Sequence, residues 1–239
     1  MTQQARAWLS AARSVCVLTG AGISAESGIP TFRGAGGLWR EYRAEDLATP
    51  AAFRRDPKLV WEWYDWRRGV VCAASPNAGH RALAEFEERL GDAFTLVTQN
   101  VDGLHERAGS ARVHRLHGSL WRVRCTGCGV ESADERVPLP ELPPRCETCG
   151  AMLRPGVVWF GERLPEQELD AAVAAASACE VMLVVGTSAV VYPAAELAPL
   201  ARRAGARVVE VNVEETPQSG LADAAIRGAA AAVLPEILL

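Results

Sequence analysis

The sequence predicts an α/β protein built on a Rossmann-type parallel sheet, with a smaller lobe inserted into it. Short apolar runs of strand character alternate with helical stretches, which favours a parallel sheet covered by helices on both faces. Two segments, roughly 34–74 and 123–154, interrupt this alternation. We therefore expect a sheet domain that is discontinuous in sequence and a second lobe formed by the two insertions.

Four apolar runs have the character of buried strands. They span residues 15–19, 94–98, 181–185 and 208–213. Strands that are covered on both faces are rich in apolar residues throughout and do not alternate with polar ones. We expect these runs to form the centre of the sheet.

Three helices are predicted between the strands, each preceded by a proline signal. They are expected over 77–90 with Ser75-Pro76 as N-cap and first turn and Gly91 as the end, over 165–179 after Pro165, and over 193–204 before Gly205. In the first insertion, Asp56-Pro57 precedes a Trp-rich helical stretch. The first insertion is therefore expected to be a helical module.

Composition limits the classes of function. With 239 residues the chain forms one large domain or a domain with a small insertion, and 49% hydrophobic residues suffice for a core. A net charge of −4 opposes binding to nucleic acid or to an anionic membrane. No signal peptide or apolar run of membrane-spanning length is present, so we expect a cytoplasmic protein.

The four cysteines Cys125, Cys128, Cys146 and Cys149 form two Cys-x-x-Cys pairs, with seventeen residues between them. This spacing is typical of a zinc ribbon, and four thiolates fill the coordination sphere, so the metal is expected to be structural. Two disulfides or four unrelated thiols remain open on spacing alone. The odd total of seven cysteines favours a reducing compartment, and the other three, Cys16, Cys72 and Cys179, are expected in the core.

Residues 20–25, Gly-Ala-Gly-Ile-Ser-Ala, follow the first strand and fit the pattern G-x-G-x-x-A, in which backbone N–H groups approach a pyrophosphate. The acidic ribose partner expected about 20 residues later is not obvious in the sequence. An ordinary strand-to-loop turn therefore remains an alternative.

A polar cluster, Thr98–His105, follows the second strand at the edge where open α/β sheets bind ligands. Its amide and carboxyl side chains can orient ribose hydroxyls. Further on, His117 lies between a strand-like run and Gly118, which suits a general base. On composition alone the choice among His80, His105, His114 and His117 stays open.

Eight motifs, taken together and in this order, resemble the sirtuin family of NAD-dependent protein-lysine deacylases. They are Gly20–Ser24, Gly28–Arg33, Thr98–His105, His117-Gly118, the two cysteine pairs, Val158–Glu162, Gly186–Ser188 and Val211–Glu214. The resemblance implies a large domain of residues 1–33, 75–122 and 155–239, with a small lobe of a helical module (34–74) and a zinc ribbon (123–154). NAD and an acyl-lysine peptide would meet in the cleft between them.

The resemblance also implies roles for individual residues. His117 would be the catalytic base, assisted by Asn100 and Asp102. NAD contacts are expected from Gly20, Ala21, Gly22, Phe32, Arg33, Trp39, Gln99, Asn100, Val101, Asp102, Gly186, Thr187, Ser188, Asn212, Val213, Glu214 and Ala230. Substrate contacts are expected from Tyr64, Arg67, Val158, Phe160, Gly161, Glu162 and Tyr192. The products would be nicotinamide, O-acyl-ADP-ribose and free lysine, and the peptide would bind as an added strand.

The acyl group is predicted from Tyr64 and Arg67, which are three residues apart on one helical face. A guanidinium and a phenol can together bind a carboxylate, although an ordinary helix pair has the same spacing. Tyr64-x-x-Arg67 and residues 34–39 resemble the class III sirtuins, which remove malonyl, succinyl or glutaryl groups. We therefore expect desuccinylase or demalonylase activity with some deacetylation.

Two other classes of function are compatible with single motifs. An NAD-dependent oxidoreductase would use the glycine-rich turn for hydride transfer. A zinc-ribbon nucleic-acid module would use residues 123–154, but this segment has four arginines against five acidic residues. It therefore lacks the basic footprint that nucleic-acid binding needs.

Overall fold

The computed structural model describes residues 1–32, 37–38 and 43–239. Its larger sheet has six parallel strands in the order β3-β2-β1-β7-β8-β9. The strands are β1 (Val15–Thr19), β2 (Phe94–Thr98), β3 (Val113–Arg115), β7 (Val181–Val185), β8 (Arg207–Asn212) and β9 (Ala224–Arg227). The four predicted strands are confirmed. The short edge strand β3 falls in the strand-like run that precedes His117, and the edge strand β9 was not predicted.

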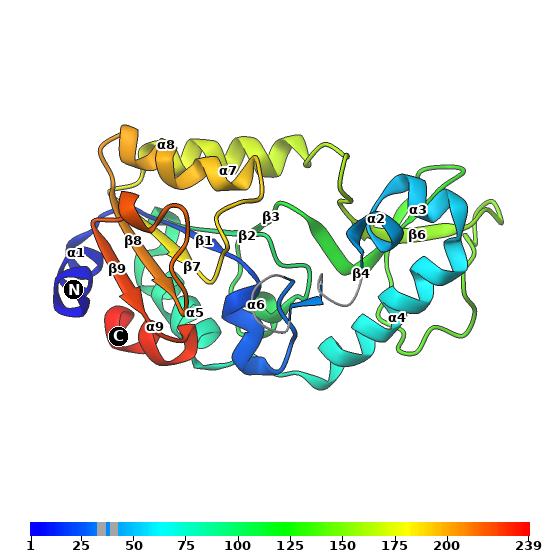
Figure 1. Ribbon diagram of the computed structural model, residues 1–239, viewed down its shortest axis with the longest axis horizontal. Coiled ribbons are helices and arrows are strands. Elements are labelled where there is room, and N and C mark those ends of the chain that lie inside the picture. Colours follow the sequence, from blue (N-terminus) through cyan, green and yellow to red (C-terminus); the bar gives the residue numbers. More distant parts are fainter. Residues whose placement is uncertain (33–36, 39–42) are drawn as a thin grey trace.

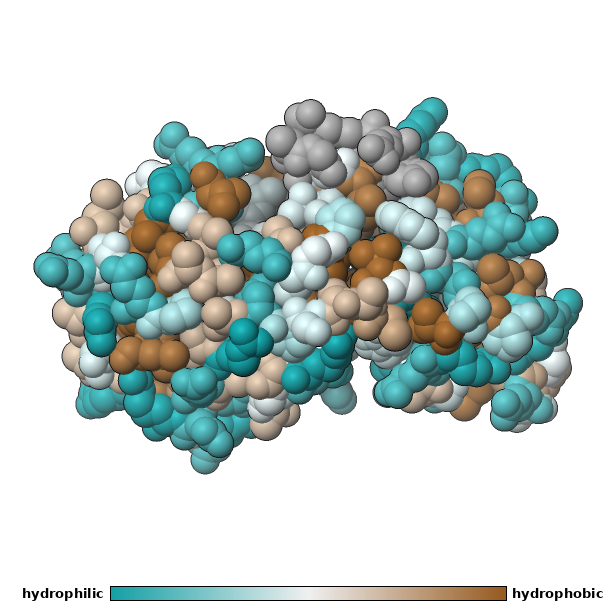
Figure 2. Space-filling model, turned by 90° about the horizontal axis from the view of Figure 1, so that it is seen from below, coloured by the Kyte–Doolittle hydropathy of each residue, from teal (hydrophilic) through white to brown (hydrophobic). Residues whose placement is uncertain are grey.

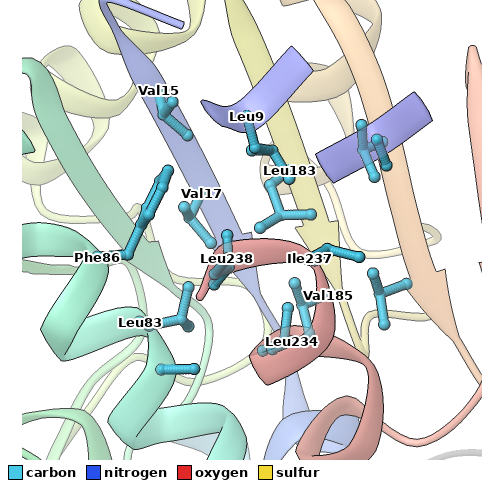
Figure 3. Close-up of a cluster of buried hydrophobic side chains, with 14 of the residues drawn as sticks. Leu9, Val15, Val17, Leu83, Phe86, Leu183, Val185, Leu234, Ile237 and Leu238 are labelled. Carbon is cyan, nitrogen blue, oxygen red and sulfur yellow. The ribbon is translucent and has the colours of Figure 1, made fainter. Parts of the chain in front are cut away.

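Helices cover both faces of this sheet (Figure 1). Helices α1 (Thr2–Ala11), α5 (Ala78–Leu90) and α9 (Ala230–Leu238) pack on one face, and α7 (Glu166–Ala178) and α8 (Leu197–Arg203) pack on the other. The side chains of β1 alternate between the two cores: Val15 and Val17 face the first, and Cys16 and Leu18 face the second. Figure 3 shows the first core, with Leu83 and Phe86 of α5 and Leu234 of α9 against β1 and β7.

Helix α5 begins later than predicted. Its N-cap is Asn77, whose side-chain oxygen accepts hydrogen bonds from the backbone N–H groups of Gly79 and His80. The ring of His80 in turn accepts a hydrogen bond from the backbone N–H of Asn77. The prediction of Ser75 as N-cap was wrong, because this reciprocal pair satisfies the helix start two residues further on.

The smaller sheet is antiparallel, with strand order β5-β4-β6. Its strands are β4 (Gly118–Cys125), β5 (Glu131–Ala133) and β6 (Leu153–Val157), and beside them lie the helices α2 (Ala44–Leu47), α3 (Pro50–Arg55) and α4 (Pro57–Ala73). These elements form the right-hand part of Figure 1, away from both chain ends. The predicted fold class, a parallel sheet with a smaller lobe, is confirmed. The assignment of residues 1–33, 75–122 and 155–239 to one domain stays a prediction.

The long helix α4 is fixed to the smaller sheet by buried polar contacts. Arg68 is 1% exposed, and it donates hydrogen bonds to the backbone carbonyls of Leu120 (2.9 Å) and Asp134 (2.8 Å). The indole N–H of Trp61 donates to the carbonyl of Leu153 at 2.8 Å. Because buried donors are costly to leave unpaired, these bonds hold the face of α4 that carries Trp61 and Arg68 in one position.

The remaining short elements lie in the segments that connect the strands and helices. They are η1 (Ala21–Ser27), η3 (Gly91–Ala93), α6 (Leu104–Arg107), η4 (Ala194–Glu196) and η5 (Ser219–Leu221). Helix η4 runs directly into α8, so the predicted helix over 193–204 is a 3₁₀ turn followed by a short α-helix. Within the described part of the chain, no helix combines the length and apolar character that crossing a membrane requires.

Candidate active site

A cavity of about 830 Å³ lies at the carboxyl ends of β1 and β7 and extends to α4 and β6. The chain proceeds from β1 to β2 and β3 on one side, whereas β7, β8 and β9 lie on the other side. Parallel sheets bind ligands at such a switch point in strand order. Figure 2 shows the two parts of the molecule side by side, with an indentation in the outline where they meet.

Most of the predicted NAD and substrate residues line this cavity. They are Gly20, Ala21, Gly22, Phe32, Tyr64, Arg67, Gln99, Asn100, Val101, His117, Val158, Phe160, Gly161, Glu162, Gly186, Thr187, Ser188, Tyr192, Asn212, Val213 and Glu214. Asp102 and Ala230 do not line it. Arg33 and Trp39, both predicted NAD contacts, lie outside the described residues.

The loops after β1 and β7 are packed against each other through glycines. The N–H of Gly22 donates to the carbonyl of Gly186 at 2.8 Å, and a Cβ on Gly22 would lie 2.6 Å from the Cα of Gly186. Gly186 itself has a φ of +59°, which side chains rarely adopt. The glycines of the G-x-G pattern are therefore required for the close approach of these two loops.

His117 is the only one of the four histidines, all of them described, that lines the cavity. Its Nδ1 lies 2.9 Å from the backbone carbonyl of Gln99, and since a carbonyl can only accept, Nδ1 carries the proton. In the neutral ring Nε2 then has a free lone pair. Burial lowers the pKa of His117, although the Gln99 carbonyl opposes this shift. The ring is therefore suited to accept a proton near neutral pH.

The other three histidines are buried in the protein or paired with a carboxylate away from the cavity. His80 and His105 are buried, and burial lowers the pKa of His80 to about 4 and that of His105 to about 3. His105 Nε2 lies 2.9 Å from Thr19 Oγ1, which donates to Thr98 Oγ1. The ring of His114 lies 2.8 Å from Glu168. The geometry therefore separates His117 from the histidines that sequence reasoning could not rank against it.

A buried polar network lies behind the cavity wall, and sequence reasoning did not find it. Ser24 Oγ donates to Asp102 Oδ2 at 2.8 Å and lies 3.4 Å from the ring of His80. Asp102 Oδ1 accepts from the backbone N–H of Leu104, and burial raises the pKa of Asp102. The amide of Asn100 donates to the carbonyl of Gly20 at 3.1 Å. Asp102 thus anchors the loop after β2 from behind, and of the side chains in this network only that of Asn100 lines the cavity.

The far side of the cavity is formed by the ends of β7 and β8. The Thr187 hydroxyl accepts from the amide of Gln99 at 2.9 Å, and the amide of Asn212 donates to the carbonyl of Thr187 at 2.9 Å. Glu214 and Glu215 follow β8 and line the same region. Acidic side chains therefore reach the cavity from the end of β8.

The end of the cavity nearest the small lobe is aromatic and carries one cation. The Cζ of Arg67 lies 4.8 Å from the ring centre of Phe32 and 4.9 Å from that of Trp63. Arg67 is 8% exposed, and among the described residues lining the cavity it alone is positively charged. Within the described part of the chain it forms no ion pair with a carboxylate. Burial lowers its pKa, whereas the neighbouring Tyr64 and Asp102 oppose that shift.

The four predicted cysteine ligands converge on one point. Their sulfur atoms all lie within 4.8 Å of one another, at 3.4 Å between Cys125 and Cys149 and at 3.8 Å between Cys128 and Cys146. A tetrahedral zinc with Zn–S bonds of 2.3 Å requires sulfur atoms about 3.8 Å apart. The backbone N–H of Cys128 donates to the sulfur of Cys125 and lowers its pKa, which favours the thiolate. The donor set and its size fit a structural zinc ion.

The other cysteines divide differently from the prediction. Cys16 and Cys179 are buried in the second core as expected, and burial raises the pKa of both thiols. Cys72 is exposed near the end of α4, so its predicted core position was wrong. It lies on the solvent side of an amphipathic helix, which the apolar neighbours in the sequence did not reveal.

The fold and the site define a Rossmann-like α/β protein whose small lobe carries a zinc-ribbon cysteine cluster. A sequence profile of the Sir2 family matches residues 20–193, and the chain belongs to this family. It is 59% identical over 210 residues to a protein of Aquifex aeolicus named NAD-dependent protein deacylase, covering 88% of this chain and 87% of that protein. It is 56% identical to NAD-dependent protein deacylase 2 of Pyrobaculum aerophilum, covering 96% of this chain and 92% of that protein.

Solved structures agree with this family. A mutant Sir2 homologue in complex with ADP-ribose has a TM-score of 0.95 and 48% identity, covering all of this chain and 95% of that one. A Sir2 complex with a p53 peptide and NAD⁺ has a TM-score of 0.88 and 34% identity, covering 99% of this chain and 97% of that one.

Proposed function

We propose that this chain is an NAD-dependent protein-lysine deacylase that prefers acidic acyl groups such as succinyl and malonyl. Membership of the Sir2 family and the names of the relatives support the deacylase activity. The preference for an acidic acyl group rests on one observation: Arg67 is a buried cation without a carboxylate partner among the described residues, at one end of the cavity that contains His117.

NAD would bind along the ends of β1, β2, β7 and β8. The loops of Gly20–Gly22 and Gly186–Ser188 would hold the phosphates and the adenosine, with Asn212, Val213 and Glu214 beside them. Gln99 and Asn100 would lie at the ribose and the nicotinamide. When bound, NAD supplies an activated C1′ carbon to the acyl oxygen of the substrate. The structural zinc ion would be held by Cys125, Cys128, Cys146 and Cys149 and would take no part in the reaction.

His117 would remove a proton from a ribose hydroxyl through Nε2. The carbonyl of Gln99 holds the proton on Nδ1, so Nε2 is free to accept. The same carbonyl stabilises the imidazolium that forms. Asp102 would act on the reaction only through Ser24 and the loop that carries Asn100. In this proposal His117 touches the reacting atoms and Asp102 positions the residues that do.

A buried guanidinium is costly unless an anion compensates it. The faces of Phe32, Trp63 and Tyr64 lower this cost through cation–π contacts, which an ordinary buried arginine could use as well. The aromatic rings, however, leave the in-plane N–H donors of the guanidinium without a carboxylate. A succinyl or malonyl carboxylate reaching this end of the cavity would supply the missing negative charge.

The acyl-lysine peptide would lie between the segment Val158–Glu162 and the loop 190–192. Phe160, Val190 and Tyr192 are exposed apolar side chains at the mouth of the cavity or next to its lining residues. A peptide added there as a strand would be recognised mainly through its backbone. Sequence preference around the acyl-lysine would therefore be weak, and we propose acyl-lysine proteins in the cytoplasm as the partners.

The reaction is tested by mass spectrometry of one peptide sequence carrying succinyl-, malonyl- or acetyl-lysine, incubated with the protein in the presence and absence of NAD. The proposal requires free lysine, nicotinamide and O-succinyl-ADP-ribose, all dependent on NAD. An NAD-dependent oxidoreductase would instead form reduced nicotinamide, which is recognised by its near-ultraviolet absorbance. Removal of acetyl but not of succinyl or malonyl would leave the deacylase activity standing and would refute the proposed acyl class.

A further inference from the structure

Trp159 links the segment after β6 to helix α4 at the end of the cavity that contains Arg67. It lies between β6 and α7 and is 3% exposed, as is Tyr64 on α4. The indole N–H of Trp159 donates to the hydroxyl oxygen of Tyr64 at 3.0 Å. Both side chains line the cavity beside Arg67.

This hydrogen bond fixes the direction of the Tyr64 proton. A phenol oxygen conjugated to its ring has two preferred in-plane positions, one for a lone pair and one for its proton. Trp159 has no acceptor on its indole nitrogen, so it must donate, and it occupies the lone-pair position. Within the described part of the chain, Tyr64 donates its own proton to no protein acceptor. The phenol is therefore held as a donor for a ligand in the cavity.

The indole is itself held on several sides. The Cζ of Arg154 lies 3.6 Å from the centre of the Trp159 ring, and Phe53 packs at 5.3 Å between ring centres. Arg154 donates to both carboxylate oxygens of Glu162, at 2.6 and 2.8 Å. Glu162 also accepts from the backbone N–H of Trp159 at 2.9 Å. Because these contacts act on the ring and on the backbone, Trp159 has little freedom to rotate.

The stacked cation also affects the strength of the donor. A guanidinium over an indole face withdraws electron density from the ring, which makes its N–H a better hydrogen-bond donor. The side chain of Glu162 is directed at Arg154, although its backbone belongs to the segment expected to bind the substrate. Glu162, Arg154 and Trp159 form a continuous chain of contacts that ends at the hydroxyl of Tyr64.

We infer that Trp159 is a specificity-determining positioning residue: it orients the Tyr64 hydroxyl so that, beside Arg67, it donates to the carboxylate of an acidic acyl group. This inference rests on the proposed acidic-acyl preference. It assigns to the Val158–Glu162 segment a second task besides peptide binding. A phenylalanine at position 159 would fill much of the same space but could not direct the phenol.

The test is a double-mutant cycle with Trp159→Phe, Tyr64→Phe and the double variant, measuring kcat/KM for succinyl and acetyl peptides in the presence of NAD. We expect Trp159→Phe to lower the succinyl-to-acetyl ratio by about fivefold, the scale of one neutral hydrogen bond. In the Tyr64→Phe background the same change should leave the ratio unaltered, because no hydroxyl remains to be oriented. Melting temperatures of the variants identify a general loss of packing.

The outcomes separate this inference from the function on which it rests. A wild type that removes acetyl and not succinyl refutes the acidic-acyl preference, and with it this role of Trp159. A wild type that prefers succinyl, combined with an unchanged ratio in Trp159→Phe, refutes the role of Trp159 alone. A ratio that falls equally with and without the Tyr64 hydroxyl shows that Trp159 acts through packing, which also refutes the inference.

Discussion

Nδ1 of His117 donates a hydrogen bond to the backbone carbonyl of Gln99, with 2.9 Å between the two atoms. The carbonyl belongs to the loop that follows β2, and the backbone carbonyl of His117 accepts from Val158 at 2.9 Å. The loop after β2 therefore fixes both the position and the tautomer of the histidine. The same loop presents Asn100 to the cavity, so base and ribose site are held by one structural unit.

We predict that His117→Ala removes nearly all turnover while leaving the fold intact. The substitution removes the only histidine of the cavity, and loss of a general base costs about 100-fold or more in rate. Deacylation of a succinyl peptide, circular dichroism and NAD binding should be measured on the same sample. His114→Ala, which removes a partly exposed histidine paired with Glu168, is the matched control. Inactivity of the control together with an active His117→Ala variant would show that the base is assigned to the wrong histidine.

The pH dependence should follow from the same site. A base must be unprotonated, so activity falls as the pH drops through the pKa of His117. Burial lowers that pKa from its ordinary value of 6.5. We therefore expect the acidic limb of kcat/KM to lie below pH 6.5, and to be missing from the residual activity of His117→Ala. A limb above pH 6.5 would contradict the neutral, buried base.

The core of the fold was predictable because its signals are local. Runs such as Val181–Val185 are apolar at every position, as strands covered on both faces must be. The edge strand Ala224–Arg227 has no such run and is defined by its pairing with β8, so it was not predicted. The start of α5 was missed because a histidine completes its capping box where the usual pattern has glutamate or glutamine.

We predict that Cys125→Ala loses the bound zinc and destabilises the small lobe. Three sulfur ligands cannot close the tetrahedron, and Cys125 is buried against the packing of α4 and the small sheet. Metal content by elemental analysis and the melting temperature report the two effects. Cys72→Ala, which changes an exposed cysteine, is the control and should retain the zinc. A wild type free of zinc, or an unaffected Cys125→Ala variant, would contradict a structural site.

The buried histidines should make the fold sensitive to acid. Burial lowers the pKa of His80 to about 4 and that of His105 to about 3, from 6.5. At pH values between 6.5 and the lowered pKa of each histidine, the unfolded chain binds a proton that the native state does not bind. Their contribution to stability is therefore present above pH 6.5 and is lost as the pH falls towards 3, by up to about 1.4 kcal/mol per pH unit for each histidine.

Urea unfolding between pH 7 and 4 measures this effect. His105→Gln removes one titrating group, so its free energy of unfolding, although lower at pH 7, should depend less steeply on pH than that of the wild type. His114→Gln changes a partly exposed histidine and serves as the control. Equal slopes for the wild type and His105→Gln would show that His105 titrates in the folded protein as it does in the unfolded chain.

The candidate site was predicted mainly through motif resemblance, and its energetics came only from the structure. The sequence places Tyr64 and Arg67 on one helical face, but it cannot show that Arg67 is buried without a carboxylate. That property depends on Phe32 and Trp63, which come from different segments and meet only in the folded chain. Ser24 and His80 were missed as partners for the same reason, since 56 residues separate them.

The central claim is that Arg67 compensates the carboxylate of an acidic acyl group, and kcat/KM for succinyl and acetyl peptides in wild type and Arg67→Met tests it most directly. Loss of a charged partner in a buried site costs about 2–5 kcal/mol, so desuccinylation should fall by at least about tenfold. Deacetylation, whose acyl group has no charge, should fall far less or rise. Tyr64→Phe should show a smaller loss in the same direction, and Lys58→Met, an exposed cation of the same helix, should change neither activity. A parallel fall for both acyl groups in Arg67→Met would contradict the account, because it would show that Arg67 supports the fold and does not recognise the acyl group.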